Sequence, residues 1–156
     1  ERFDVYAPDI IVYNITLFYS NKNTQPFNVY TYQSKRFIKI NENIDNIVEM
    51  YTVGSSQYLI TNDNKLYVNG KNIRGRHGIG EVSLGDDTGF ILNKFYDNKY
   101  IYTINQSRNC FHSIIYTENK LYGCGDNIHC EISNNNEIKQ HHEPIITCIV
   151  NKVFKE

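Results

Sequence analysis

Two stretches of this sequence nearly repeat each other: Asn64-Lys65-Leu66-Tyr67-Val68-Asn69-Gly70-Lys71-Asn72-Ile73 and Asn119-Lys120-Leu121-Tyr122-Gly123-Cys124-Gly125-Asp126-Asn127-Ile128. When residues 54–78 are aligned without gaps to residues 109–133, an offset of 55 residues, eight of 25 pairs are identical. That agreement is well above chance for this composition. A repeat of this period is typical of propellers, solenoids and other arrays of one small structural unit.

Each copy has the pattern of a β-hairpin. In the first copy an apolar run at 58–61 and a strand at 65–69 flank the polar turn 62–64; the second copy has the same order at 111–117, 118–119 and 120–124. Runs of β-branched and aromatic residues bounded by Asn and Asp predict paired strands. Further candidate strands precede the hairpins at 47–53 and 100–104. Each repeat is therefore expected to form a small sheet of three or four strands.

Both first strands are nearly continuous apolar runs, which predicts burial on two faces between stacked sheets. Gly70 and Gly125 close the two hairpins, where a tight exit or a positive φ excludes a side chain. Asn72 and Asn127 follow them and are expected to cap the turn with Asx-type hydrogen bonds. These residues are predicted to be structural.

This signature resembles the repeat of the regulator of chromosome condensation family. In that family a glycine and a His-Ser pair precede an apolar strand, and a Leu-Tyr strand leads to Gly-x-Asn and a glycine-rich tail. The residues that carry the resemblance are Gly54, Leu66, Tyr67, Gly70, Asn72, Gly75, Gly78 and Gly80 in the first copy, and His112, Ser113, Leu121, Tyr122, Gly125 and Asn127 in the second. The resemblance implies four-stranded blades arranged radially around a channel.

The sequence also departs from the family pattern. Asn69 and Cys124 replace the aromatic residue before the closing glycine, and the chain has no Trp. The remaining departures are Gln57-Tyr58 for His-Ser, Asn109 for the first glycine, and Cys130 and Ser133 for the tail glycines. These blades are degenerate, and the family's specific activities carry over only weakly.

The predicted fold is all-β, a partial β-propeller with repeat 1 at residues 47–100 and repeat 2 at residues 101–156. Residues 1–46 form either a decayed blade, with strands near 15–20 and 27–32, or an N-terminal extension. A complete propeller of this family needs about seven units, so we expect a piece of a longer chain whose remaining blades are its neighbours. Open outer faces should then expose Leu59, Ile60, Ile114 and Ile115 and favour self-association.

Charge and cysteine content limit the choice of function. The formal net charge is −1, from 16 basic and 17 acidic residues without a run of like charge, so binding to nucleic acid is not supported. No apolar stretch has membrane-spanning length and no signal pattern is present, so no membrane association is expected. Four cysteines without CxxC spacing favour reduced thiols in the cytoplasm or nucleus.

No residue pattern predicts a catalytic centre, a metal site or a cofactor. Cys124, His129, Cys130, His141 and His142 lack the close pairing of zinc ligands. The neighbouring strand residues His112 and Ser113 point to opposite faces and cannot act as a catalytic dyad.

The segment Gly75–Gly80 lacks the ending of a phosphate-binding loop and is expected to be a turn between blades. Its neighbourhood contains the most cationic short stretch of the chain, formed by Arg74, Arg76 and His77. These three residues are the candidate loop for binding an acidic partner surface.

Propeller blades that hold loops in place favour a protein–protein interaction scaffold. The family resemblance implies two alternatives: guanine-nucleotide exchange on a small GTPase, and recruitment of substrates as an adaptor of a ubiquitin ligase. The residues at hand do not separate the adaptor from a general scaffold.

Overall fold

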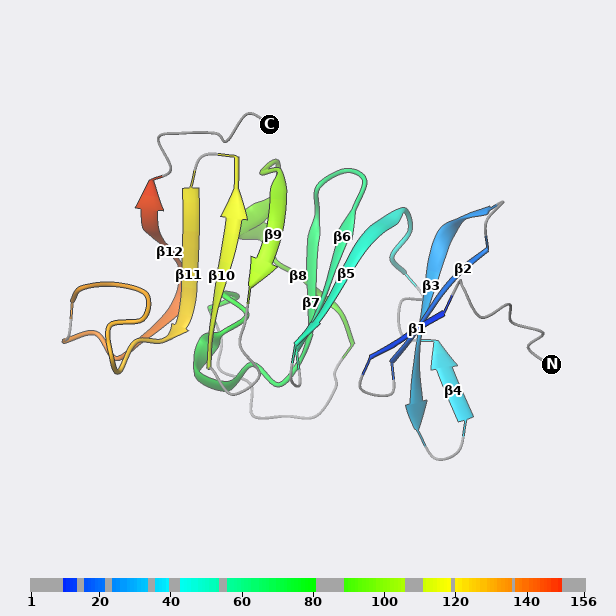
Figure 1. Ribbon diagram of the computed structural model, residues 1–156, viewed down its shortest axis with the longest axis horizontal. Helices are drawn as coiled ribbons and strands as arrows, with labels where there is room; N and C mark the ends of the chain where they lie inside the picture. Colours follow the sequence, from blue (N-terminus) through cyan, green and yellow to red (C-terminus); the bar gives the residue numbers. More distant parts are fainter. Residues whose placement is uncertain are drawn as a thin grey trace.

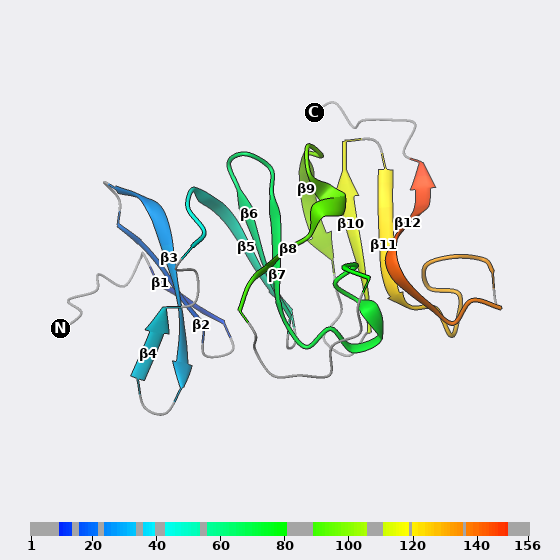
Figure 2. The ribbon, with the colours of Figure 1, turned by 180° about the vertical axis from the view of Figure 1, so that it is seen from behind.

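The computed structural model describes residues 10–13, 16–21, 24–33, 36–39, 43–53, 56–80, 89–105, 111–118, 120–135 and 137–149. Gly54 of the repeat signature lies outside these residues. Within them the chain forms three four-stranded antiparallel sheets, which stand side by side along the long axis of the molecule in both views (Figures 1 and 2).

The strands of each sheet follow the order of the sequence. The first sheet contains β1 (Ile10–Tyr13), β2 (Thr16–Asn21), β3 (Thr24–Gln33) and β4 (Arg36–Lys39). The second contains β5 (Ile47–Val53), β6 (Ser56–Thr61), β7 (Leu66–Gly70) and β8 (Ile91–Leu92). The third contains β9 (Ile101–Asn105), β10 (His112–Thr117), β11 (Lys120–Asp126) and β12 (Gln140–Ile149). Two 3₁₀ helices, η2 (Ile73–Gly75) and η3 (Lys94–Tyr96), follow β7 and β8.

The prediction of an all-β partial propeller is confirmed. The two copies of the repeat form the second and third strands of their sheets, β6–β7 and β10–β11, so they occupy the same topological position. Tyr67 of β7 and Tyr122 of β11 are equivalent, as the repeat predicts. The division of the chain into repeats at residues 46 and 100 stays a prediction.

The gapless register of the repeat holds in β7 and β11 but not in the strands before them. Tyr67 pairs with Leu59, whereas Tyr122 pairs with Ile115, so Leu59 and not Ile60 is the counterpart of Ile115. The cause is the turn. Residues 62–64 form a three-residue loop that ends in Asn64 at φ 58°, whereas only two positions separate β10 from β11. A three-residue loop of this kind needs a left-handed last residue, and Asn tolerates that conformation.

The core lies on both faces of the second sheet. Against the third sheet, a buried cluster joins Tyr58, Ile60, Leu66 and Val68 to Tyr96, Ile101, Ile104, Ile115 and Tyr122. On the opposite face Leu59 packs with Ile44 and Ile47. The prediction that β6 is buried on two faces is therefore confirmed.

The expected exposure of apolar strand residues is largely wrong. Leu59, Ile60 and Ile115 are fully or almost fully buried, because the second sheet is covered on both faces and Ile115 points towards it. In β10 buried and half-buried residues alternate, and Ile114 is half-buried. In β11, by contrast, five consecutive residues are buried, so the outer face of the third sheet is partly covered. Among the described residues no helix is long and apolar enough to cross a membrane.

The glycines that close the hairpins have the predicted backbone. Gly70 has φ 94° and Gly125 has φ 108°. A Cβ atom added at Gly125 would lie 2.2 Å from the carbonyl oxygen of Phe111 and 2.7 Å from the Cα of His112. Both obstacles are backbone atoms, so a side chain at position 125 would force the two strands apart.

Gly125→Ala is therefore expected to lower the free energy of unfolding by about 2–3 kcal/mol, from left-handed strain and the backbone clash together. Gly89→Ala is the matched control. Gly89 also has positive φ, 89°, but an added Cβ there has no neighbour within 4 Å, so about 1 kcal/mol of strain is expected. Urea denaturation measures both variants, and equal losses would show that the close contact at Gly125 is unimportant.

Cys130 stands where the first repeat has Gly75. The backbone is left-handed at both positions, with φ 61° at Cys130 and φ 77° at Gly75. In both copies the amide of this residue donates a hydrogen bond to the carbonyl oxygen three residues earlier, on Asn72 or Asn127. The second copy has thus kept the turn and lost the glycine that suits it.

Cys130→Gly is expected to raise the free energy of unfolding by up to about 1 kcal/mol, because relief of left-handed strain exceeds the added entropy of the unfolded chain. Cys130→Ala keeps a Cβ atom and is expected to give no gain. Both variants are compared with the parent by urea denaturation under reducing conditions. A gain from alanine as large as that from glycine would contradict the strain argument.

Candidate functional site

A buried segment joins the second sheet to the third. Residues 72–80, here called the inter-sheet connection, leave β7 and cross to β11 and β12. The amide of Gly80 donates to the carbonyl oxygen of His142 at 3.0 Å. The carbonyl oxygen of Arg76 accepts from the Ser113 hydroxyl at 2.5 Å and from the Cys124 thiol at 3.2 Å. The connection is therefore anchored to three strands of the third sheet.

Asn72 holds the inter-sheet connection in shape from within. Its side-chain oxygen accepts a hydrogen bond from the amide of His77 at 2.8 Å. Asn127 does the same in the second copy, where its side-chain oxygen accepts from the amide of Ile132 at 2.9 Å. Both bonds span five residues, so the prediction of short Asx-type caps is wrong in its span. Both asparagines are buried, and each fixes the whole loop that follows it.

Two glycines allow the inter-sheet connection to approach the third sheet closely. A Cβ atom at Gly75 would lie 2.8 Å from the Cα of His142. At Gly78 it would lie 2.8 Å from Pro144 Cγ and 3.0 Å from Cys124 Sγ. Since one of the obstacles is backbone and another a rigid ring, these contacts leave no room for larger residues.

The structure separates the three residues of the candidate partner-binding loop. Arg76 and His77 are only 3% and 2% exposed, so a partner cannot reach them in this structure. Arg76 donates from Nε to the carbonyl oxygen of Lys71 at 2.8 Å, and burial lowers its pKa. Of the three, only Arg74 has substantial exposed surface. The sequence suggested a cationic loop because it does not show which side chains turn inward.

Arg74 itself links the two sheets. Its guanidinium forms an ion pair with the Asp126 carboxylate at 2.7 Å and lies over the ring of Phe111, 5.2 Å from the ring centre. The other carboxylate oxygen of Asp126 is buried and has no partner among the described residues. Removal of Arg74 would therefore leave a mostly buried carboxylate without its cation, which is costly.

His77 is a neutral interior residue. Its Nε2 lies 2.8 Å from the hydroxyl of Ser56, and its ring makes an edge contact with Tyr58 at 5.7 Å between ring centres. Burial, with a smaller effect from the charge of Arg76, lowers the pKa of His77 to about 3. The imidazole is therefore uncharged at neutral pH and contributes packing and one hydrogen bond.

The other polar residues considered for chemistry are also structural in their surroundings. Ser113 is buried and bonded to Arg76, while the half-buried His112 is on the adjacent position of β10. Burial raises the pKa of the Cys124 thiol to about 12, so this thiol stays protonated. Within the described part of the chain, no three His, Cys, Asp or Glu side chains gather in a way that would hold a metal ion.

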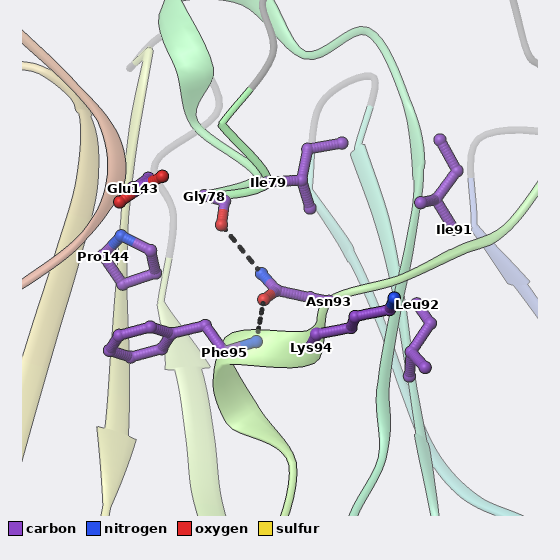
Figure 3. Close-up of a pocket in the computed structure, with 9 residues that line it drawn as sticks. All are labelled: Gly78, Ile79, Ile91, Leu92, Asn93, Lys94, Phe95, Glu143 and Pro144. Carbon is purple, nitrogen blue, oxygen red and sulfur yellow. Dashed lines mark hydrogen bonds between the residues drawn. The ribbon is translucent and has the colours of Figure 1, made fainter.

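A groove that the sequence did not indicate lies where the second and third sheets meet. It has a volume of about 440 Å³ and is lined by Gly78, Ile79, Ile91, Leu92, Asn93, Lys94, Phe95, Glu143 and Pro144. Figure 3 shows Glu143 and Pro144 of β12 on one side, and β8 with the start of η3 on the other. The groove depends on contacts between sheets, so no local pattern in the sequence could have revealed it.

Asn93 shapes this groove. Its side-chain amide donates to the carbonyl oxygen of His77 at 2.8 Å. The same amide donates to the carbonyl oxygen of Gly78 at 3.3 Å, and the side-chain oxygen accepts from the amide of Phe95 (Figure 3). One buried residue thereby ties the inter-sheet connection to η3. The walls of the groove are held by hydrogen bonds rather than by side-chain packing alone.

Protonation of His77 is expected to destabilise the fold in acid. The unfolded chain binds this proton below pH 6.5, whereas the folded chain resists it until about pH 3. Stability is therefore lost as the pH falls through this window, by up to about 1.4 kcal/mol per pH unit. His77→Gln cannot titrate, so its free energy of unfolding should fall less steeply between pH 6.5 and 4. Parallel slopes for the two proteins in urea denaturation would contradict a neutral buried His77.

Comparison with protein-family models gives no match, and comparison with curated protein sequences gives none either. Solved structures do match. Prp20p from Saccharomyces cerevisiae, whose crystal structure was described with its binding to Gsp1p and histones, aligns at a TM-score of 0.63 and 16% identity, over 88% of this chain and 37% of Prp20p. Yeast RCC1 (Prp20) bound to Kap60 aligns at 0.63 and 17% identity, over 88% and 36%.

Human WBSCR16 aligns at a TM-score of 0.64 and 10% identity, over 85% of this chain and 37% of WBSCR16. The chain thus spans little more than a third of the length of these proteins, and the likeness is one of fold. It agrees with the resemblance that the repeated hairpins indicated. The chain has the fold of a partial β-propeller, like that of the regulator of chromosome condensation proteins.

Proposed function

We propose that this chain is part of a β-propeller scaffold that binds a protein partner, with its three sheets as successive blades. The observation that supports this most is the buried inter-sheet connection. Its contacts to β10, β11 and β12 fix the second sheet against the third. A fixed joint holds the exposed edges and loops of both sheets in one geometry, as a binding surface requires.

The chemistry of the joint also supports a scaffold. Ser56, His77, Asn72 and Asn93 use their polar groups on one another or on the backbone of the connection. Cys124 is buried and its thiol protonated. These groups stabilise structure. The partner surface of this proposal consists of the exposed part of Arg74 and the groove beside β8. A cytoplasmic or nuclear location is part of the proposal and agrees with the free thiols of Cys124 and Cys130.

Guanine-nucleotide exchange on a small GTPase is the second candidate. The observation in its favour is the structural likeness to Prp20p, which is described as binding Gsp1p. The ubiquitin-ligase adaptor remains a variant of the scaffold proposal, in which the bound protein is a substrate.

The scaffold proposal is tested with the purified chain and with purified candidate proteins, starting with Gsp1p and core histones. Proteins that crosslink to the chain in cell extract are purified and added to the candidates. Titration calorimetry should then give a saturable isotherm with at least one of them. Mass spectrometry of the crosslinks should place the contact on Arg74 or on the groove. If no purified protein binds saturably, the scaffold proposal is wrong for this chain.

The exchange candidate predicts that the chain accelerates release of labelled nucleotide from one member of a panel of small GTPases. Arg74→Ala should reduce this acceleration, while the exposed residue change Lys71→Ala should leave it unchanged. Because Arg74 also neutralises Asp126, thermal unfolding of each variant must show that the sheets remain folded. Absence of release across the panel would remove the exchange candidate and leave the scaffold proposal standing.

A further inference from the structure

The outer edges of the second and third sheets differ beside the groove. On β12 the carbonyl oxygen of His142 already accepts a hydrogen bond from the amide of Gly80. Pro144, two residues further along the same edge, has no N–H to offer. This edge is therefore closed to a further strand in the region of the groove, as natural sheets commonly arrange.

Among the described residues, the edge formed by β8 pairs with β7 on one side only. The amide of Asn93 donates to the carbonyl oxygen of Leu66 at 2.8 Å, so Asn93 faces β7. Backbone groups of successive strand residues point to opposite sides. Leu92 therefore directs its N–H and C=O away from β7, whereas Ile91 directs its own towards Val68. No hydrogen bond to the backbone of Leu92 on this open side is found among the described residues.

Apolar surface lies beside this free edge. Ile91 is 45% exposed and Phe95 is 37% exposed, and Ile79 is half-buried in the same groove. Figure 3 shows Ile91 on the side of β8, Phe95 beside Pro144 on the opposite side, and Ile79 between them. Exposed aliphatic and aromatic side chains next to an unpaired strand edge offer both components of strand addition, namely backbone hydrogen bonds and side-chain pockets.

Two opposite charges flank the apolar surface. Lys94 and Glu143 are exposed, come from opposite walls of the groove, and take part in no ion pair within the described residues. An ammonium and a carboxylate held apart on two walls favour a ligand that carries an acidic group at one point and a basic group at another. This pattern distinguishes the groove from a plain apolar cleft.

We infer that an extended segment of the protein partner binds in this groove as an added strand on β8. The segment forms backbone hydrogen bonds with Leu92 and places aliphatic side chains against Ile91 on one side of the groove and Phe95 on the other. An acidic residue of the segment faces Lys94, and a basic residue faces Glu143. This inference rests on the proposed scaffold function and specifies the chemistry that one of its surfaces recognises.

The test uses the full chain and three fluorescein-labelled peptides that share the core Val-Thr-Val-Thr-Val and carry one charged residue at each end. The Asp/Lys peptide has Asp at one end and Lys at the other, the Asp/Asp peptide has Asp at both ends, and the Lys/Lys peptide has Lys at both ends. Fluorescence anisotropy at low salt should rank the Asp/Lys peptide first for the parent chain. Lys94→Glu should switch the preference to the Lys/Lys peptide, and Glu143→Lys should switch it to the Asp/Asp peptide. For each variant, the Kd of the newly preferred peptide is expected to be about fivefold lower than that of the Asp/Lys peptide.

Two controls complete the charge test. The double variant with Lys94→Glu and Glu143→Lys again has one charge of each sign, but in exchanged positions. It should therefore rank first a fourth, mixed-charge peptide whose Asp and Lys ends are exchanged, with a Kd within about twofold of that of the original pair. Lys65→Glu and Glu137→Lys change exposed charges outside the groove and should leave the ranking unchanged. No binding by any peptide, or a ranking that ignores residues 94 and 143, overturns the inference.

Amide hydrogen exchange tests the backbone hydrogen bonds of the added strand independently of the charged side chains. Saturation with the Asp/Lys peptide should slow exchange at the Leu92 amide and leave Ile91 unaffected, because the amide of Ile91 already faces β7. Binding without protection of Leu92 would refute strand addition. If the peptide test or the exchange test fails, strand addition is wrong, but the scaffold proposal is still tested by titration calorimetry with whole proteins. The two proposals can therefore fail separately.

Discussion

The contact between the inter-sheet connection and the edge of the third sheet is the constraint on which the rest of the structure depends. Gly75 and Gly78 approach His142, Pro144 and Cys124 so closely that an added Cβ would collide. That approach brings the carbonyl oxygen of Arg76 within reach of Ser113 and Cys124. The large inter-sheet core around Tyr58 and Tyr122 can close only when the two sheets stand at this separation.

The joint buries several polar side chains, among them Asn72, Asn93 and Asn127. A buried polar group without a hydrogen bond costs about 1–3 kcal/mol. Asn72, Asn93 and Asn127 avoid this cost by bonding to backbone groups of the loops that they enclose. The polar interior therefore selects one geometry for each loop, whereas an apolar core would accept several packings. The same hydrogen bonds also set the shape of the groove, because Asn93 both fixes the inter-sheet connection and lines the groove.

The second and third sheets differ in how completely they are covered. The second is buried on both faces, and β6 accordingly has five buried residues among its six. In the third, β10 alternates between buried and half-buried residues, whereas five consecutive residues of β11 are buried. Exposed Tyr102 stacks on half-buried Tyr116 at 5.1 Å between ring centres, next to exposed Tyr100. The aromatic rings shield one another where no other sheet covers them within the described part of the chain.

The sequence by itself determined the hairpins, their turns and the positive φ of Gly70 and Gly125, because these depend on residues that are close along the chain. It also determined the repeat and, through it, the class of fold. The gapless alignment of the two copies was wrong by one residue in the first strand of each hairpin. It paired Ile60 with Ile115 because they are identical, although the turn that follows is one residue longer in the first copy.

Only the tertiary structure decided which polar residues face inward. Arg74, Arg76 and His77 are neighbours in sequence, yet Arg74 keeps exposed surface while it pairs with Asp126 of the third sheet. Arg76 and His77 are buried, with the His77 ring against Ser56 and Tyr58 of the second sheet. The groove beside β8 likewise combines residues 78–79, 91–95 and 143–144. Burial and groove shape arise from contacts between sheets that lie far apart along the chain, and a local pattern contains no information about which residues will meet there.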